Sequence, residues 1–173
     1  LSAAAVALEL GATPAGVAES LSAAAPASRW RMEVADRADG VTVVNDAYDA
    51  NPETMLAALE ALADLGRDRR TWAVLGRMAE LGDTEAAAHA EVAGAAAALG
   101  VGTLVAVGEP GYGPAARHVT DPAAALALLR AEVSPGDVVL VKASRAVGLD
   151  RVADALLNDT PRDDRQENEL VSR

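Results

Sequence analysis

Polar side chains of chemically useful types gather in one short turn, "NDAYDANPETM", at residues 45–55. The turn follows the apolar run "VTVVN" and precedes the periodic run "MLAALEALADLG", so it connects an expected strand to an expected helix. Asp46 stands just past the strand, where its carboxylate could accept hydrogen bonds from a ribose or other vicinal hydroxyls. Tyr48 and Asp49 could face a flat ring, and Asn51 could cap the next helix. The alternative is structural: Asp46 only turns the chain and Asn51 only caps it.

A second set of candidates lies in "VKASRAVG", at residues 141–148. Lys142 is the only lysine in the chain, and Ser144 and Arg145 follow it. A cation, a hydroxyl and a bidentate guanidinium suit a carboxylate or a phosphate. The alternative is that Lys142 and Arg145 only offset an acidic surface.

Two further loops follow apolar runs. "LGRMAELGDT" presents Arg77 and Glu80 between two glycines, either toward a ligand or as surface charges on a tight connection. His89 falls in the helix after it, and without a partner such a histidine is more often packed than catalytic. "VGEPGYGP" spaces its glycines as G-x-x-G-x-G rather than G-x-G-x-x-G, so we interpret it as an ordinary loop.

The elements that must position these loops alternate along the chain. "RMEVADRADGVTVVND" predicts a β-hairpin around Asp39 and Gly40. Helices expected at about 52–66, 84–99, 121–132 and 146–157 then alternate with the short apolar strands "TWAVLG", "TLVAVG" and "DVVLVK". This order predicts an α/β fold, an open, doubly wound (Rossmann-like), mostly parallel sheet with an N-terminal hairpin. Ligands of such sheets bind where the strands' carboxyl ends meet.

Composition narrows the function classes. A net charge of -11 argues against nucleic-acid binding, because a phosphate backbone requires a basic surface. With no cysteine and two histidines we expect no disulfide and no metal ligand, which fits a cytoplasmic protein. The sequence has no G-x-x-x-x-G-K-[ST], G-x-S-x-G or H-E-x-x-H motif, so we expect no catalytic residue in this chain.

Differences in periodicity and polarity divide the chain into three segments. Residues 1–24 predict two short helices, separated at "GATP", which are too short between polar residues to insert in a membrane. The Pro-containing stretch "APASRWR" then predicts a boundary, and polar residues 159–173 predict a flexible tail. The chain does not begin with Met, which leads us to expect a piece of a larger protein.

Four motifs in order resemble one family. "SRWRMEV", "NDAYDANPETM", "VLGRMAELGD" with its downstream histidine, and "VLVKASRAVGLDRV" are similar to segments of the Mur ligases that add D-alanyl-D-alanine to the peptidoglycan precursor. The resemblance spreads over residues 29–152. It implies that residues 28–158 form the last domain of a three-domain enzyme, and that residues 1–27 are the closing helices of its central ATPase domain.

The implied reaction is an amide ligation. ATP phosphorylates the terminal carboxylate of UDP-N-acetylmuramoyl-tripeptide, and the amine of D-alanyl-D-alanine then attacks the acyl phosphate. ATP and Mg²⁺ would be held mainly by upstream domains that carry the P-loop. The last domain would close over the nucleotide, exclude water and position the substrates, and would be inactive alone.

The resemblance also assigns roles to residues. Arg31 would approach the nucleotide phosphates, Asp46 the ribose and Asp49 the adenine, beside Tyr48 and Asn51. A second group would lie near the peptide substrates: Arg77, Glu80, Lys142, Ser144 and Arg145.

Three residues depart from the family pattern. Asp49 replaces an Asn and so loses two amide donors. Arg77 replaces an Asp, which reverses the charge, and Ala143 replaces a Gly, which disfavours a positive φ. Three other readings stay open: a folylpolyglutamate-synthase-like ligase, although that group favours a His in the first turn; a noncatalytic nucleotide-sensing or interaction module; and a nicotinamide dehydrogenase domain, disfavoured by the missing glycine fingerprint.

Overall fold

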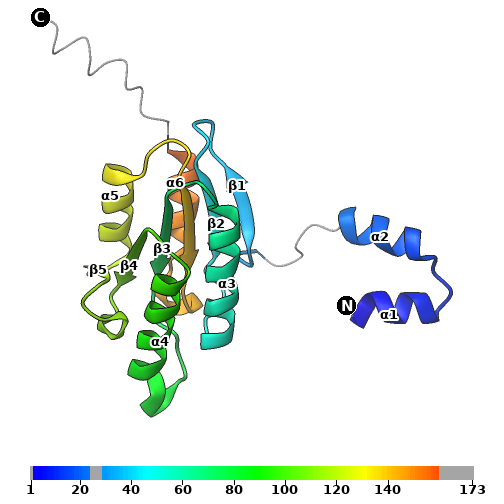
Figure 1. Cartoon of the computed structure of the whole chain (residues 1–173), viewed down its shortest axis with the longest axis horizontal. Coiled ribbons are helices and arrows are strands. Elements are labelled where there is room, and N and C mark those ends of the chain that lie inside the picture. Colours follow the sequence, from blue (N-terminus) through cyan, green and yellow to red (C-terminus); the bar gives the residue numbers. More distant parts are fainter. Residues whose placement is uncertain (1, 24–28, 160–173) are drawn as a thin grey trace, which may run out of the picture.

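A six-stranded sheet forms the centre of the computed structural model, which describes residues 2–23 and 29–159 (Figure 1). The strands are β1 (Glu33–Asp36), β2 (Thr42–Asp46), β3 (Thr71–Leu75), β4 (Thr103–Val107), β5 (Arg117–Val119) and β6 (Val138–Lys142). The α-helices are α1 (Ser2–Glu9), α2 (Pro14–Ala23), α3 (Pro52–Leu65), α4 (Glu85–Ala98), α5 (Pro122–Glu132) and α6 (Asp150–Asn158).

The strand order is β1-β2-β6-β3-β4-β5. β1 pairs antiparallel with β2, and the turn between them uses Gly40, whose φ of 83° is accessible to glycine. All other neighbouring strands are parallel. In the register of β2 and β6, Asp46 pairs with Lys142, so the two candidate loops leave the sheet side by side. The predicted α/β fold with its hairpin is confirmed.

Helices cover both faces of the sheet because the strands are apolar on both faces. Met55 and Leu59 of α3 pack with Leu140 on one face, together with residues of α4. Leu129 of α5 and Leu156 of α6 pack on the opposite face. The chain therefore leaves β2 toward one face and β6 toward the other, which opens a crevice between their carboxyl ends.

Two elements differ from the expectation. The helix expected at 146–157 is a 3₁₀ turn (Arg145–Val147) followed by α6, because Gly148 adopts a left-handed conformation with φ 75° between them. The loop "VGEPGYGP" contains a 3₁₀ turn (Pro110–Tyr112) and is followed by the unpredicted strand β5. Only three residues long and mostly exposed, β5 has no apolar pattern that a sequence could reveal.

The predicted segments 1–27, 28–158 and 159–173 stay predictions, because residues 24–28 and 160–173 lie outside the described part of the chain. The two predicted N-terminal helices are present as α1 and α2, and Figure 1 shows them apart from the sheet. Among the described helices, none has the length and apolar character needed to cross a membrane.

Candidate functional site

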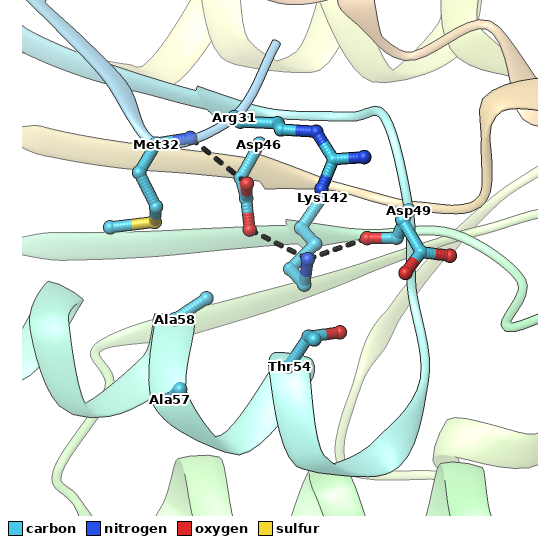
Figure 2. A pocket seen from close by; sticks show the side chains of 8 residues that line it. All are labelled: Arg31, Met32, Asp46, Asp49, Thr54, Ala57, Ala58 and Lys142. Carbon is cyan, nitrogen blue, oxygen red and sulfur yellow. Dashed lines mark hydrogen bonds and ion pairs between the residues drawn. The ribbon is translucent and has the colours of Figure 1, made fainter. Parts of the chain in front are cut away.

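A pocket of about 310 Å³ opens at the carboxyl ends of β2 and β6 (Figure 2). It combines two acidic and two basic side chains with the first turns of α3. The lining residues are Arg31, Met32, Asp46, Asp49, Thr54, Ala57, Ala58 and Lys142. Four of these eight are residues for which the sequence predicted a ligand: Arg31, Asp46, Asp49 and Lys142.

A buried ion pair forms the floor of the pocket. The Lys142 ammonium donates to Asp46 Oδ2 at 2.6 Å and to the backbone carbonyl of Asp49 at 2.6 Å. Asp46 Oδ1 accepts from the backbone N–H of Met32 at 2.9 Å. Only 2% of the Lys142 side chain is exposed, and its bond to the Asp49 carbonyl holds the turn after β2 in place. Each carboxylate oxygen of Asp46 keeps one lone pair for a further donor.

Asn51 caps α3. Its side-chain oxygen accepts from Thr54 N at 2.9 Å, while Thr54 Oγ1 accepts from Asn51 N at 3.1 Å, which completes a capping box. This local bond, together with Pro52 at the start of the helix, determines where the polar turn ends.

Ser144 joins three loops. Its hydroxyl accepts from Ala79 N at 2.9 Å and lies 3.5 Å from the carbonyl of Ala50, and its N–H donates to the carbonyl of Arg77 at 3.0 Å. The loops after β2, β3 and β6 are therefore tied together at one point. Ala143 is fully buried and its φ is not positive, so the methyl group that replaces the family's glycine introduces no backbone strain.

The loop after β3 carries two exposed candidates. Arg77 forms a bidentate ion pair with Glu85, at 2.5 and 2.8 Å, which lowers the pKa of the Glu85 carboxyl through hydrogen bonding. The reversed charge at this position thus has a partner within the chain. Glu80 is exposed, and its φ of 66° is left-handed, an uncommon conformation for a residue with a side chain. Neither residue lines the pocket of Figure 2.

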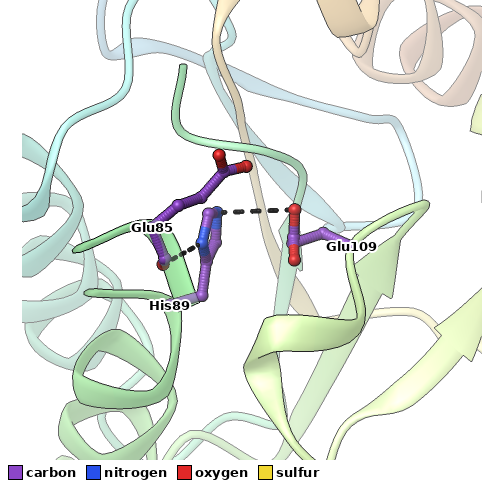
Figure 3. Close-up of side chains that lie close together, drawn as sticks. All are labelled: Glu85, His89 and Glu109. Carbon is purple, nitrogen blue, oxygen red and sulfur yellow. Dashed lines mark hydrogen bonds and ion pairs between the residues drawn. The ribbon is translucent and has the colours of Figure 1, made fainter. Parts of the chain in front are cut away.

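Buried His89 supports the same loop (Figure 3). Its Nε2 accepts from Met78 N at 3.0 Å, and its Nδ1 lies 2.7 Å from the carbonyl of Glu85, so Nδ1 carries the proton of a neutral ring. Tyr112 packs edge-on against the ring at 4.9 Å and donates to the carbonyl of Gly76 at 2.7 Å. Burial raises the pKa of the Tyr112 hydroxyl, which therefore remains a donor at neutral pH.

Glu85, His89 and Glu109 bring three potential metal ligands within 4.8 Å of one another. Both ring nitrogens of His89 are already engaged with the backbone, and Glu85 is paired with Arg77. Glu109 also accepts from Gly111 N at 2.8 Å. These internal bonds account for the cluster without a metal ion.

Tyr48 and Arg145 lie beside the pocket rather than in its lining. The guanidinium carbon of Arg31 lies 4.2 Å from the centre of the Tyr48 ring, and that of Arg145 lies 5.8 Å from it.

Sequence reasoning missed Met32, Thr54 and Trp30. Met32 contributes a backbone N–H, which no side-chain pattern reveals, but Trp30 stands between two arginines in a chain with 2% aromatic residues, a signal that was available.

The fold and the pocket define a Rossmann-like α/β domain. Its polar pocket lies at the carboxyl ends of the strands, where ligands of such domains bind. The chain belongs to the Mur ligase family: the model of the "Mur ligase, glutamate ligase domain" matches residues 30–145. A Mycobacterium leprae protein called UDP-N-acetylmuramoyl-tripeptide--D-alanyl-D-alanine ligase is 48% identical over 92% of this chain and 36% of its own length. An Escherichia coli protein with the same name is 31% identical over 90% of this chain and 35% of its own length.

Solved structures agree with these relatives. A MurF ligase from Thermotoga maritima in complex with ADP has a TM-score of 0.72 and 29% identity, covering 87% of this chain and 35% of that one. A MurF from Acinetobacter baumannii has a TM-score of 0.74 and 25% identity, covering 90% and 35%. The chain thus spans about a third of the length of the relatives it matches.

Proposed function

We propose that this chain is the C-terminal domain of a cytoplasmic, ATP-dependent ligase that joins D-alanyl-D-alanine to UDP-N-acetylmuramoyl-tripeptide in peptidoglycan synthesis. The observation that carries the proposal is the pocket around Asp46, which lies at the strand ends within the segment matched by the family model. The names of the 48%-identical relative and of the ADP-bound structure support the substrates and the nucleotide.

In this proposal the domain completes a site begun by two upstream domains. Residues 1–27 are the closing helices of the central domain, residues 28–158 form the mobile domain, and residues 159–173 are a tail. The tripeptide carboxylate is phosphorylated by ATP, and the amine of D-alanyl-D-alanine displaces phosphate to form the amide. Closure of the domain excludes water from the acyl phosphate and brings the amine into reach.

Two side chains of the pocket, those of Arg31 and Asp46, make the main contacts with the nucleotide in this proposal. Arg31, exposed at the rim of the pocket, neutralises phosphate charge. The Asp46 carboxylate accepts hydrogen bonds from the ribose hydroxyls with its remaining lone pairs. The Lys142 ammonium and the Met32 N–H keep this carboxylate oriented. Mg²⁺ supplies charge neutralisation of the phosphates. In this proposal the upstream domains hold the Mg²⁺, and the one cluster of three potential ligands among the described residues is already engaged within the chain.

The peptide substrates are assigned to the loops after β3 and β6. Arg77 and Glu80 present exposed charged groups on the loop after β3, and Arg145 presents one on the loop after β6. Ser144 contributes by holding these loops together, because its hydroxyl and N–H are bonded to their backbone. Asp49 and Tyr48 complete the nucleotide side.

The test compares this chain with a polypeptide that also carries the two upstream domains. The longer protein should release phosphate only when ATP, the tripeptide precursor and D-alanyl-D-alanine are all present, and the 173-residue chain should be inactive. In the longer protein, Asp46→Asn should raise the KM for ATP, whereas Asp64→Asn on the exposed surface of α3 should not. Nucleotide binding without ligation by the longer protein would instead favour a sensing module.

A further inference from the structure

Five side chains at the edge of the pocket alternate as cations and aromatic rings. We call them the arginine–aromatic cluster: Arg29, Trp30, Arg31, Tyr48 and Arg145. Arg145 lies 5.6 Å from the centre of the Trp30 ring and 5.8 Å from that of Tyr48. Arg29 lies 5.4 Å from Trp30, and Arg31 lies 4.2 Å from Tyr48. Each of the two rings therefore has two guanidinium groups within the roughly 6 Å of its centre at which cation–π contacts form.

The cluster draws on three separate parts of the chain. Residues 29–31 precede β1, Tyr48 belongs to the turn after β2, and Arg145 follows β6. Trp30 and Met32 on either side of Arg31 have left-handed φ values of 63° and 48°. Such conformations are uncommon for residues with a side chain and persist only where the surroundings impose them. The segment that presents Arg31 is therefore held in an unusual shape, with its side chain over Tyr48.

Arg31 and Arg145 differ from other arginines of the chain in what surrounds them. Six arginines form ion pairs with a carboxylate within 3.0 Å: Arg37, Arg67, Arg70, Arg77, Arg117 and Arg130. Within the described ranges, neither Arg31 nor Arg145 has such a pair, and Arg29 only approaches Asp154 at 3.9 Å. In a chain with net charge -11, this is a local concentration of unneutralised positive charge.

We propose that Tyr48 is a positioning residue that holds Arg145 beside Arg31, so that the two guanidinium groups form a clamp for one phosphate-type oxyanion. Because both arginines contact the same ring, their guanidinium carbons are separated by no more than the sum of their distances to it. Each presents a planar fork of N–H donors suited to phosphate oxygens. The clamp therefore moves Arg145 to the phosphate side of the crevice, and so revises the peptide-side role that the family resemblance assigns to it.

The inference rests on the proposed function for the source of the oxyanion, which is either a nucleotide diphosphate or the acyl phosphate. The clamp can be tested without ligation, by isothermal titration of the 173-residue chain with inorganic pyrophosphate at constant ionic strength. Titrations with ADP and with acetyl phosphate then separate the sources: the tighter of the two identifies which phosphate the clamp serves.

The variants distinguish the effect of the Tyr48 ring on binding from that of its hydroxyl. They also distinguish the effect of Arg145 from that of a change in net charge. Tyr48→Phe keeps the ring and should bind pyrophosphate like the unmodified chain. Tyr48→Leu should weaken binding about fivefold, the loss expected from two exposed cation–π contacts. Arg145→Met should weaken it about tenfold, as expected for a lost charged hydrogen-bonding group. Arg67→Met removes one positive charge elsewhere and should leave binding unchanged.

Four outcomes would overturn the clamp: no binding of pyrophosphate by the unmodified chain, equal binding by Tyr48→Leu, equal losses for Tyr48→Phe and Tyr48→Leu, or an equal loss for Arg67→Met. Circular dichroism and thermal unfolding without anion establish that each variant is folded. Arg145→Lys, which keeps the charge but lacks the planar fork, should fall between Arg145→Met and the unmodified chain. Failure of the clamp leaves ligation by the longer protein intact, so the two proposals fail separately.

Discussion

Replacement of Lys142 by methionine tests whether the buried ion pair organises the pocket. The ammonium group makes two hydrogen bonds of 2.6 Å, to the Asp46 carboxylate and to the Asp49 carbonyl, and methionine can make neither. Methionine has a similar length and keeps the apolar packing of the lysine stem. The change therefore isolates the loss of charge and of the two bonds, and leaves a carboxylate buried without its counter-ion.

The magnitude follows from burial. Only 2% of the Lys142 side chain and 13% of the Asp46 side chain are exposed, so water compensates little for the lost partner. Removing one member of such a buried pair costs about 3–5 kcal/mol. Replacing both members is far less costly, because no buried charge remains. Lys142→Met with Asp46→Asn should therefore be more stable than Lys142→Met alone by about 2 kcal/mol or more. Asn at position 46 also keeps an acceptor for Met32 N–H.

The assay is urea unfolding followed by circular dichroism, for the unmodified chain, the two single variants and the double variant. Arg67→Met serves as the control, because Arg67 pairs with Asp64 where both side chains are at least 75% exposed, and its loss should hardly change stability. If Lys142→Met is no more destabilising than Arg67→Met, or if the double variant loses as much as the two single variants together, the ion pair does not organise this pocket.

Three further changes have defined outcomes. Burial alone would raise the pKa of Asp137, but hydrogen bonds from the Arg70 guanidinium, Ser134 N–H and the Trp72 indole outweigh it and lower that pKa. Asp137 therefore stabilises the fold above its unfolded pKa of about 3.9 and loses that effect as the pH falls toward its folded pKa. Asp137→Asn should reduce stability at pH 7 and flatten its loss in acid, measured by urea unfolding at several pH values. Tyr112→Phe should cost about 1–3 kcal/mol at pH 7, because the Gly76 carbonyl loses its donor. Because burial raises the Tyr112 pKa, the unmodified chain should also lose stability as the pH rises above about 10, and the Phe variant less so. Gly76→Ala would place a Cβ 2.8 Å from that of Ala143, so about 1–3 kcal/mol of destabilisation is expected, partly recovered by Ala143→Gly.

Each of these changes has a result that contradicts its reasoning. Equal pH dependence for Asp137→Asn and the unmodified chain would mean that the carboxylate is not differentially stabilised in the folded state. Equal loss of stability above about pH 10 for Tyr112→Phe and the unmodified chain would likewise mean that ionisation of Tyr112 does not cause that loss. For Gly76→Ala, no recovery on adding Ala143→Gly would place the steric conflict elsewhere, at Val147 or Leu149, whose side chains lie 3.0 and 3.3 Å from the same Cβ.

Much of the fold could be predicted because its signals are local. Helix α3 begins where Asn51 and Pro52 stand together, and the strands β2, β3 and β6 are short apolar runs buried on both faces. β5 was missed since three mostly exposed residues carry no periodicity, and the break before α6 depends on the conformation of Gly148. The position of candidate residues at strand ends could also be predicted, because parallel strands place their carboxyl ends at one edge.

The sequence by itself determined the fold class, the family and the loops in which polar residues gather, because each depends on the order of residues along the chain. Only the tertiary structure decided what those residues contact, since their partners lie far apart in sequence. Lys142 reaches across 96 positions to Asp46 and thereby becomes buried, although its type and place in the sequence indicate a ligand contact. In the same way, Tyr48 meets Arg31 and Arg145 only because β2 and β6 are neighbours in the sheet.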